Sequence, residues 1–148
     1  MRPKVEVLGA VQGIPGVHSV QRHPDAASIP GLLLFRFNAP IVFFNAPFFR
    51  RSIFQAIQST EPSLKWFVVD MIPITMIDIT GLQTVREVIE DLRKRGIEFI
   101  AAGRAMEWKL WTESRRLESG WRSFPTLRAA IKAYKRENGP LRDIRKTA

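Results

Sequence analysis

Cysteine is absent from the 148 residues, and only two histidines are present. Without cysteine the chain has no disulfide framework, no cysteine-based metal site and no thiol nucleophile, which suits a reducing compartment. His18 and His23 both precede the segment where the regular core is expected to begin. Metal binding and histidine-based catalysis are therefore not expected.

Long uninterrupted apolar runs are also missing. The most apolar stretch, residues 31–49, is broken by Arg36, Asn38, Asn45 and two prolines, whereas a membrane-spanning helix needs about 20 apolar residues. No basic segment followed by an apolar run stands at the N-terminus, so no signal peptide is expected. The 148 residues by themselves are expected to form a soluble domain.

Few residues could serve a catalytic site. Asp70 and Asp78 are the only carboxylates between residues 62 and 86, and Thr80 has no nearby histidine or lysine to act as a base. An enzyme needs convergent acid, base or nucleophile groups, and the sequence contains neither a Walker loop nor a GxGxxG motif. The sequence therefore predicts no enzyme, no catalytic residue and no cofactor.

Positive charge is present in excess, with a formal net charge of +9. Residues 1–103 hold 11 Lys or Arg against 9 Asp or Glu, and residues 104–148 hold 12 against 5. The C-terminal third could therefore contact nucleic acid or an anionic membrane surface. An ordinary solvated helix surface explains the same charges equally well.

Hydrophobic periodicity predicts strands and helices in alternation. Strands are expected at Val5–Leu8, Leu32–Phe37, Ile41–Phe44, Leu64–Asp70 and Ile97–Ala102, and helices at 46–58, about 80–95, about 105–118 and about 126–137. Such alternation implies a mostly parallel sheet with right-handed crossovers. The expected fold class is a single α/β domain with a central sheet of four to five strands and about four to five helices.

Three regions are expected along the chain. Residues 1–30, which are rich in Gly, Pro and polar residues, should form an extended lead-in arm with one short strand. Residues 31–138 should form the folded domain, and residues 139–148 a frayed basic tail. Within the domain, Trp66–Val69 is expected inside the sheet, and Asn45 is expected to be the N-cap of the first helix.

Helical spacing also predicts which side chains face the core in the last two helices. The third helix is expected to carry Met106, Leu110 and Leu117 on one side, with Trp108 and Trp111 nearby and at least some of the tryptophans in the core. The last helix is expected to bury Leu127, Ala130, Ile131 and Tyr134.

A short junction, Asp78-Ile79-Thr80-Gly81, joins an expected strand to an expected helix. In an open α/β sheet, ligands and partners meet the carboxyl ends of strands, and a helix N-terminus offers unpaired amides and a partial positive charge. Asp78 or Thr80 can accept a hydrogen bond from those amides, and Gly81 would leave the first turn uncovered for another molecule. Plain helix capping explains the same residues, so both interpretations stay open.

Several ordered segments resemble the STAS domain, the module shared by sulphate transporters and anti-sigma-factor antagonists. They are FFNAPFF (43–49), VVDMIPITMIDITGLQTVREVIEDLRKRGIEFIAA (68–102) and FPTLRAAIKAY (124–134). The lead-in HPDAASIPGLLLFRFNAPIVFFNA (23–46) resembles, more narrowly, the cytoplasmic C-terminal domain of SulP-type anion permeases. The resemblance covers roughly residues 16–136.

The resemblance implies a regulatory or interaction surface, with no catalytic centre. Thr80 stands where the antagonist branch carries a phosphorylatable Ser in an Asp-Ser-Ser-Gly-type sequence, and Ile79 replaces the first Ser. The loop Asp78, Ile79, Thr80 and Gly81 is therefore expected to be regulatory, with Thr80 exposed. In a permease, such a domain would lie on the cytoplasmic side of the plasma (inner) membrane, near anionic lipid. It would dock to the membrane domain of the same transporter or to cytosolic regulatory proteins.

Other functions stay open beside the transporter role. The chain could be a free-standing antagonist-like switch that is phosphorylated at Thr80. It could also be a nucleic-acid-binding domain, because basic residues alternate with tryptophans in a way that suits backbone charge and base stacking; these are Lys109, Arg115, Arg116, Arg122, Arg128, Lys132, Lys135 and Arg136, with Trp108, Trp111 and Trp121. Weak nucleotide or anion binding is expected near Asn45 and Thr80, where two helices begin.

Overall fold

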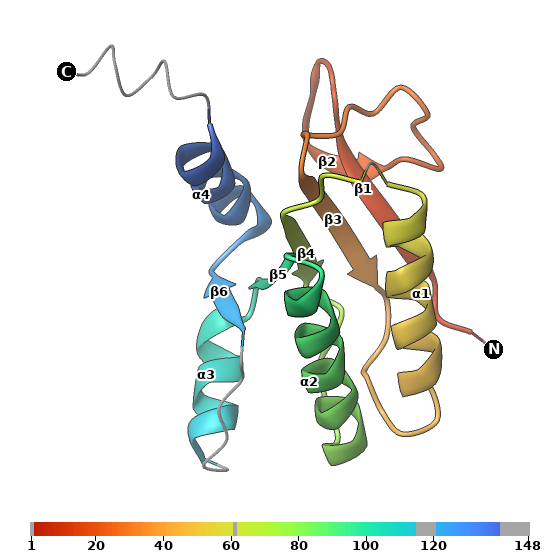
Figure 1. The fold of residues 1–148 in the computed structure, drawn as a ribbon, viewed down its shortest axis with the longest axis vertical. Coiled ribbons are helices and arrows are strands. Elements are labelled where there is room, and N and C mark those ends of the chain that lie inside the picture. The colour runs from red at the N-terminus through yellow and green to blue at the C-terminus, as the bar shows by residue number, and fades with distance from the viewer. Residues whose placement is uncertain (1, 61, 115–120, 140–148) are drawn as a thin grey trace.

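A six-stranded sheet organises the part of the chain that the computed structural model describes, residues 2–60, 62–114 and 121–139 (Figure 1). Its strands are β1 (Val5–Val11), β2 (Ile14–Ser19), β3 (Leu32–Phe37), β4 (Trp66–Asp70), β5 (Glu98–Ala102) and β6 (Arg122–Phe124). The helices are α1 (Ala46–Gln58), α2 (Ile79–Lys94), α3 (Ala105–Ser114) and α4 (Leu127–Asn138). No helix within these residues is long and apolar enough to cross a bilayer.

The strands lie in the order β2-β1-β3-β4-β5-β6. β3, β4, β5 and β6 run parallel to one another, and β1 pairs antiparallel with both β2 and β3. The predicted class, a mostly parallel sheet with connecting helices, is confirmed. The sheet contains six strands where four to five were expected, and β4 lies inside it as predicted.

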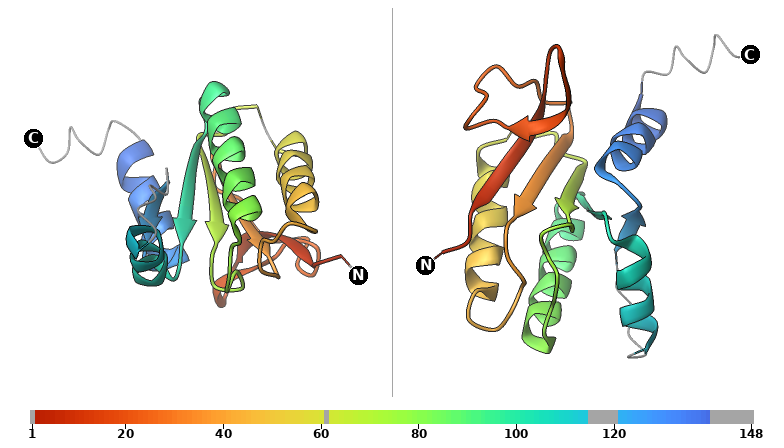
Figure 2. Two further views of the ribbon diagram at one scale, coloured as in Figure 1. Left: turned by 90° about the horizontal axis from the view of Figure 1, so that it is seen from below. Right: turned by 180° about the vertical axis from the view of Figure 1, so that it is seen from behind.

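Helices cover both faces of the sheet (Figure 2). On one face, α1 and α2 pack over a core that includes Phe35, Phe67 and Val69. On the other face, α4 packs over a smaller core that includes Leu34, Trp66 and Val68. Successive side chains of a strand point to opposite faces of the sheet. Because helices cover both faces, nearly every residue of β3 and β4 is buried, and these strands are nearly continuous hydrophobic runs.

The first 20 residues contain more regular structure than the sequence predicts. β1 and β2 form a hairpin that joins the sheet beside β3, where an extended arm with one short strand was expected. Gly13 closes the hairpin with φ +81°, a conformation that glycine adopts without strain. The second strand escapes a periodicity search because Pro15 and Gly16 interrupt it.

The expected strand Ile41–Phe44 is wrong. This segment follows β3 as a loop and makes only an isolated parallel bridge, between Ile41 and Ile77, rather than a full sheet ladder. Asn45 does occupy the N-cap position of α1, but its side chain does not cap the helix. It accepts a hydrogen bond from Val42 N at 2.9 Å and donates one to Pro40 O at 2.8 Å, so it fixes the loop instead.

The C-terminal helices are only partly as expected. In α3 the side that carries Met106 and Leu110 is exposed, and the helix buries Trp108 and Thr112 instead, so the expectation of tryptophan in the core is confirmed for Trp108. In α4 the prediction is largely confirmed, since Ala130 and Tyr134 are buried and Leu127 and Ile131 pack against the same core. Residues 115–118 of the predicted third helix, with Leu117, and residues 140–148 of the predicted tail lie outside the described residues.

Candidate functional site

Two loops meet at the carboxyl ends of the central strands, at the lower end of the molecule in Figure 1. Residues 38–45 follow β3 and residues 71–78 follow β4. Backbone hydrogen bonds join them, because Ile41 N donates to Met76 O at 3.0 Å and Asp78 N donates to Ile41 O at 3.2 Å. The predicted junction is therefore held against a second loop that is more than 30 residues distant in sequence.

Asp78 links the two loops to the start of α2. Its Oδ1 accepts a hydrogen bond from Gly81 N at 2.7 Å, which makes Asp78 the N-cap of the helix. Its Oδ2 accepts a hydrogen bond from Phe43 N at 2.9 Å. One carboxylate thus satisfies an amide of α2 and an amide of the neighbouring loop, and it complements the positive end of the helix dipole.

The interpretation of Gly81 as an open approach for another molecule is wrong. Gly81 is buried, and a Cβ at this position would overlap the carbonyl oxygen and carbon of Ile41. Glycine is needed here because the loop backbone of this same chain lies directly against the first turn of α2. The sequence contains the glycine but no sign of the segment that fills the space beside it.

Thr80 lies exposed on the first turn of α2, beside an exposed Ile79. Its position agrees with the expectation that a hydroxyl there is open to a partner. That Thr80 acts in regulation or accepts a phosphoryl group stays a prediction.

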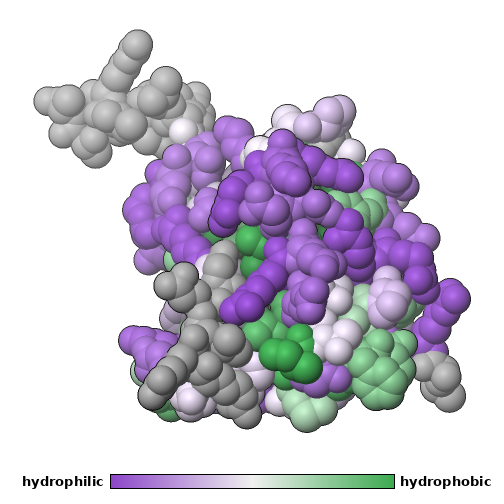
Figure 3. All heavy atoms as spheres, turned by 60° about the horizontal axis from the view of Figure 1, so that its bottom comes forward, coloured by the Kyte–Doolittle hydropathy of each residue, from purple (hydrophilic) through white to green (hydrophobic). Residues whose placement is uncertain are grey.

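Exposed apolar side chains surround this junction. Phe43 and Phe44 are 68% and 74% exposed, and Met76 and Ile79 are 51% and 73% exposed. We call these four residues the apolar edge. In Figure 3 the lower end of the molecule comes forward, and apolar side chains gather there among hydrophilic ones. Sequence reasoning missed this surface because it assigned Phe43 and Phe44 to a strand, where alternation would have buried one of them.

A hollow of about 690 Å³ borders the apolar edge, with Phe44 and Met76 among its lining residues. Arg2 and Arg51 also line it, and their guanidinium groups lie 5.2 and 6.0 Å from the ring centroid of Phe48. The Asn45 side chain is engaged within its loop, and the amides of Asn45 and Ala46 both donate to Val42 O. Nucleotide or anion binding near Asn45 and Thr80 stays a prediction.

Asp70 belongs to a buried ionic cluster on the α4 face of the sheet. Its Oδ2 accepts a hydrogen bond from Arg36 Nε at 2.8 Å, and its Oδ1 accepts one from Ile72 N at 3.0 Å. Arg36 also pairs with Glu6 on β1 at 3.5 Å. Both carboxylate oxygens of Asp70 are thus hydrogen-bonded at the end of β4.

Glu6 is only 4% exposed, yet its pKa lies below the ordinary value. Burial by itself raises the pKa of Glu6, but the hydrogen bond from Asn38 and the charges of Lys4 and Arg36 outweigh that effect. Glu6 therefore stays ionised inside the fold. Within the described residues, no three His, Cys, Asp or Glu side chains cluster closely enough to hold a metal ion.

Among the described residues of the basic C-terminal third, none of the three tryptophans is exposed. Trp108 is buried, and Trp111 and Trp121 pack against the main core. Arg122 makes two hydrogen bonds, of 2.7 and 2.6 Å, to the carboxylate of Glu137. Base stacking requires free aromatic faces, so this alternative loses its main support. Arg115 and Arg116 lie outside the described residues.

Comparison with known proteins points to one family. The model of the STAS domain matches residues 23–107. A probable sulfate transporter of Mycobacterium tuberculosis is 35% identical over 100 residues, which are 68% of this chain and 18% of that protein. The chain thus corresponds to less than a fifth of that relative's length.

Two solved structures share the fold. The murine anion transporter Slc26a9, in its inward-facing state, superposes with a TM-score of 0.77 at 14% identity over 90% of this chain and 22% of that one. A putative anti-sigma factor antagonist from Thermotoga maritima superposes with a TM-score of 0.59 at 12% identity, over 72% of this chain and 90% of that one. At such identities these two likenesses concern the fold alone.

Proposed function

The chain belongs to the STAS domain family, and we propose that it is the non-catalytic regulatory domain of a SulP-type anion transporter. The length of the relatives supports this proposal, because a sulfate transporter such as that of Mycobacterium tuberculosis leaves more than four fifths of its chain for other parts. The domain would lie at the cytoplasmic surface of the plasma (inner) membrane, and its partner would be the membrane domain of the same protein.

The observation that carries the proposal is the apolar edge. Large contiguous apolar patches are unusual on monomeric soluble proteins, and they typically mark sites of interaction. Phe43 and Phe44 are held outward by an ordered loop, because Asp78 accepts from Phe43 N and Asn45 accepts from Val42 N. A membrane domain is the partner we propose for this edge, and the nearby Arg2 and Arg51 would face the negative inner leaflet.

Thr80 would then control the contact. It lies exposed beside Ile79, at the border of the apolar edge. A phosphate there would add about −1.5 to −2 charge and three acceptor oxygens. The positive end of α2 would tolerate that charge within the domain, whereas an apolar contact surface would not. Phosphorylation would therefore change docking while the domain stays folded. Cytosolic proteins that bind the same loop would also change the docking of the domain.

The test introduces Phe43→Ser with Phe44→Ser, and separately Thr80→Glu, into the full-length transporter, and measures uptake of radiolabelled sulfate in vesicles. Ile14→Ser is the matched control, because Ile14 is an exposed apolar residue on β2. We expect the Phe43 and Phe44 double variant and the Thr80 variant each to change transport several-fold, and the control to leave it unchanged. The thermal stability of the isolated domain should shift by no more than about 1 kcal/mol, as for most surface substitutions.

The proposal would be contradicted if the Phe43 and Phe44 double variant and the Thr80 variant both transported sulfate normally, with normal amounts of transporter in the membrane. The second candidate, a free-standing antagonist-like switch, is favoured by the exposed Thr80 on the first turn of α2. It predicts instead that Thr80→Glu abolishes binding to a soluble protein partner while no membrane domain is required.

A further inference from the structure

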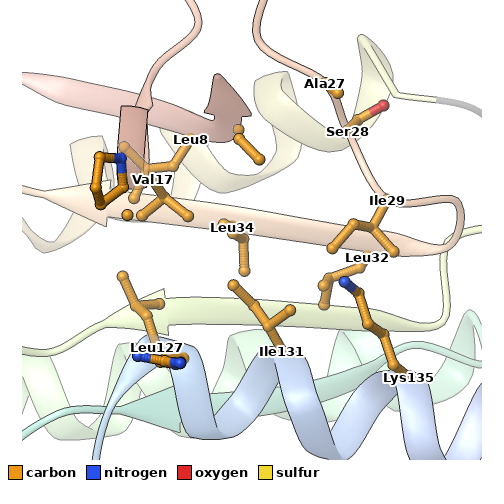
Figure 4. A pocket seen from close by; sticks show the side chains of 15 residues that line it. Leu8, Val17, Ala27, Ser28, Ile29, Leu32, Leu34, Leu127, Ile131 and Lys135 are labelled. Carbon is orange, nitrogen blue, oxygen red and sulfur yellow. The ribbon is translucent and has the colours of Figure 1, made fainter. Parts of the chain in front are cut away.

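An apolar cavity of about 510 Å³ lies on the face of the sheet opposite to α1 and α2 (Figure 4). Its floor is formed by strand residues such as Leu8 and Leu34, and α4 forms one wall with Leu127 and Ile131. In Figure 4 these two α4 side chains point toward Leu34 and Val17 across the cavity. The volume falls within the range of about 300–1,000 Å³ that is usual for small-molecule sites.

The opposite wall is held in place by a strap, the loop of residues 20–31. Ala10 and Ala27 exchange two backbone hydrogen bonds, of 3.0 and 2.7 Å, which fasten the loop to β1. Gly9 permits this approach, because a Cβ there would lie 2.9 Å from Ala27 O. This segment borders the half-open cavity, and in Figure 4 Ile29 points toward the cavity while the hydroxyl of Ser28 points away from it.

Among the described residues, two cations and no acid line the cavity. Arg128 and Lys135 are among its 15 lining residues, which include no Asp or Glu. They lie seven residues apart on α4, so they flank the cavity about 10 Å from one another along the helix axis. Within the described part of the chain, neither side chain forms an ion pair. Ser28 is the only other polar side chain in the lining.

We propose that this cavity binds a small amphipathic anion, an apolar body that carries one carboxylate, as in a medium-chain fatty acid. The apolar floor and walls would cover the body, and Lys135 or Arg128 would pair with the carboxylate at the rim. A nucleotide is a poor match, because its base and sugar need several polar partners and this lining offers one hydroxyl. The site is distinct from the apolar edge and does not depend on the docking proposal.

The test titrates the 148-residue chain with decanoate at pH 7, below its micelle concentration, by calorimetry and by two-dimensional NMR of backbone amides. Decanol, decyltrimethylammonium and sulfate serve as comparison probes. We expect saturable decanoate binding at least about tenfold tighter than binding of any of the three. Amide shifts should concentrate at Gly9, Val17 and Ile131, and the amides of the apolar edge should not move.

Variants localise the site. Arg128→Glu with Lys135→Glu should weaken decanoate binding by about tenfold or more. Lys132→Glu with Arg136→Glu is the matched control, since it changes the net charge equally on the same helix at exposed positions that do not line the cavity. Ile131→Trp should fill the cavity and abolish binding, and Val17→Trp does the same from β2 if the first variant fails to fold by circular dichroism.

Three outcomes would overturn the proposal. Equal binding of decanol and decanoate would show plain hydrophobic adsorption without the cations. Equal weakening by the two charge pairs would show a general charge effect. Unchanged decanoate binding in a folded tryptophan variant would place the ligand outside the cavity.

Discussion

Gly81 is a single position where one extra carbon would separate two parts of the domain. The first turn of α2 lies against the backbone of Ile41, which is itself bonded to Met76 and Asp78. Because the backbone of Ile41 is hydrogen-bonded on both sides, it can move away from an added methyl group less easily than a flexible side chain could. The position therefore tests how rigidly the two loops are joined.

We expect Gly81→Ala to lower the free energy of unfolding by about 1–3 kcal/mol, the usual cost of overpacking. The gain of about 1 kcal/mol that alanine brings to a helix opposes this loss only in part. Urea unfolding followed by circular dichroism measures the difference. Thr80→Ala, one residue away and exposed, is the control and should change stability by less than about 0.5 kcal/mol. A Gly81→Ala protein as stable as the wild type would mean that the loops separate freely.

For single residues, the sequence predicts what a side chain can do more reliably than which distant residues lie beside it. Asp78 before a helical run is a recognisable cap, and the structure confirms it. What fills the space beside Gly81 is set by Ile41, about 40 residues earlier, which no local pattern reveals. The same holds for Asn45, whose side chain bonds backward to Pro40 and Val42 in place of forward into α1.

Among the elements, three neighbouring strands are tied together by charge as well as by backbone. Glu6 of β1 lies opposite Arg36 of β3, and Arg36 lies opposite Asp70 of β4, so the three side chains share one level of the sheet. Arg22 adds a 3.1 Å contact to Glu6 from the loop after β2. A one-residue slip of β1 would move Glu6 to the other face and leave Arg36 with Asp70 alone.

The stability that Glu6 contributes should depend on pH. Its folded pKa lies below the ordinary value of 4.5, so the contribution is complete above that pH and is lost as the pH falls through the lower folded value. At pH 7, Glu6→Gln should lower the free energy of unfolding by about 1–3 kcal/mol, because hydrogen bonds to a charged group are lost. Below pH 4.5 the difference from the wild type should shrink.

Urea unfolding at pH 7, 5 and 3.5 measures this difference. Glu107→Gln is the control, since Glu107 pairs with Arg104 at the surface, where such pairs contribute about 0–1 kcal/mol. A loss in Glu6→Gln that stays constant down to pH 3.5 would assign its effect to packing and not to charge.

Elements with a clear apolar stripe or an apolar run were the predictable ones. α1, α2 and α4 and strands β3, β4 and β5 lie within two residues of their expected bounds, because each carries a clear apolar stripe or run. α3 was predicted, but spacing alone did not indicate that Trp108 and Thr112 are its buried side chains while Met106 and Leu110 are exposed. The sequence did not predict β2, and it wrongly predicted a strand at residues 41–44. Each contains strand-like and turn-like residues at once, and only pairing decides between them.

For the whole molecule, α4 closes the second core from the far end of the chain. Tyr134 packs its ring 5.3 Å from that of Trp66 and donates its hydroxyl hydrogen to Pro30 O at 2.7 Å. Glycine is needed at position 31, because a Cβ there would overlap the Tyr134 hydroxyl. One side chain thus joins α4 to β4 and to the strap beside the apolar cavity.

We expect Tyr134→Phe to cost about 0.5–1.5 kcal/mol, the usual net contribution of one hydrogen bond, because the part-buried bond to Pro30 O is lost while the ring contact remains. Tyr134→Ala should cost about 3–5 kcal/mol, since the ring contact is lost as well. Thermal unfolding by calorimetry distinguishes the two. Lys132→Ala, on an exposed position of the same helix, is the control. Equal losses in the Phe and Ala variants would assign the whole effect to the hydroxyl group.

The contact between Tyr134 and Pro30 spans 104 residues, and this separation has a consequence for how the protein is made. Strands β3, β4 and β5 and helices α1 and α2 can assemble as soon as residue 102 has left the ribosome, because each packs on elements already synthesised. The other face of the sheet, with Leu34, Trp66 and Val68, must wait for α4. At about 5–20 residues per second, that apolar face stays open for roughly 2–6 seconds in each newborn chain. We expect the nascent domain to be most prone to aggregation, and most open to chaperone binding, during this interval.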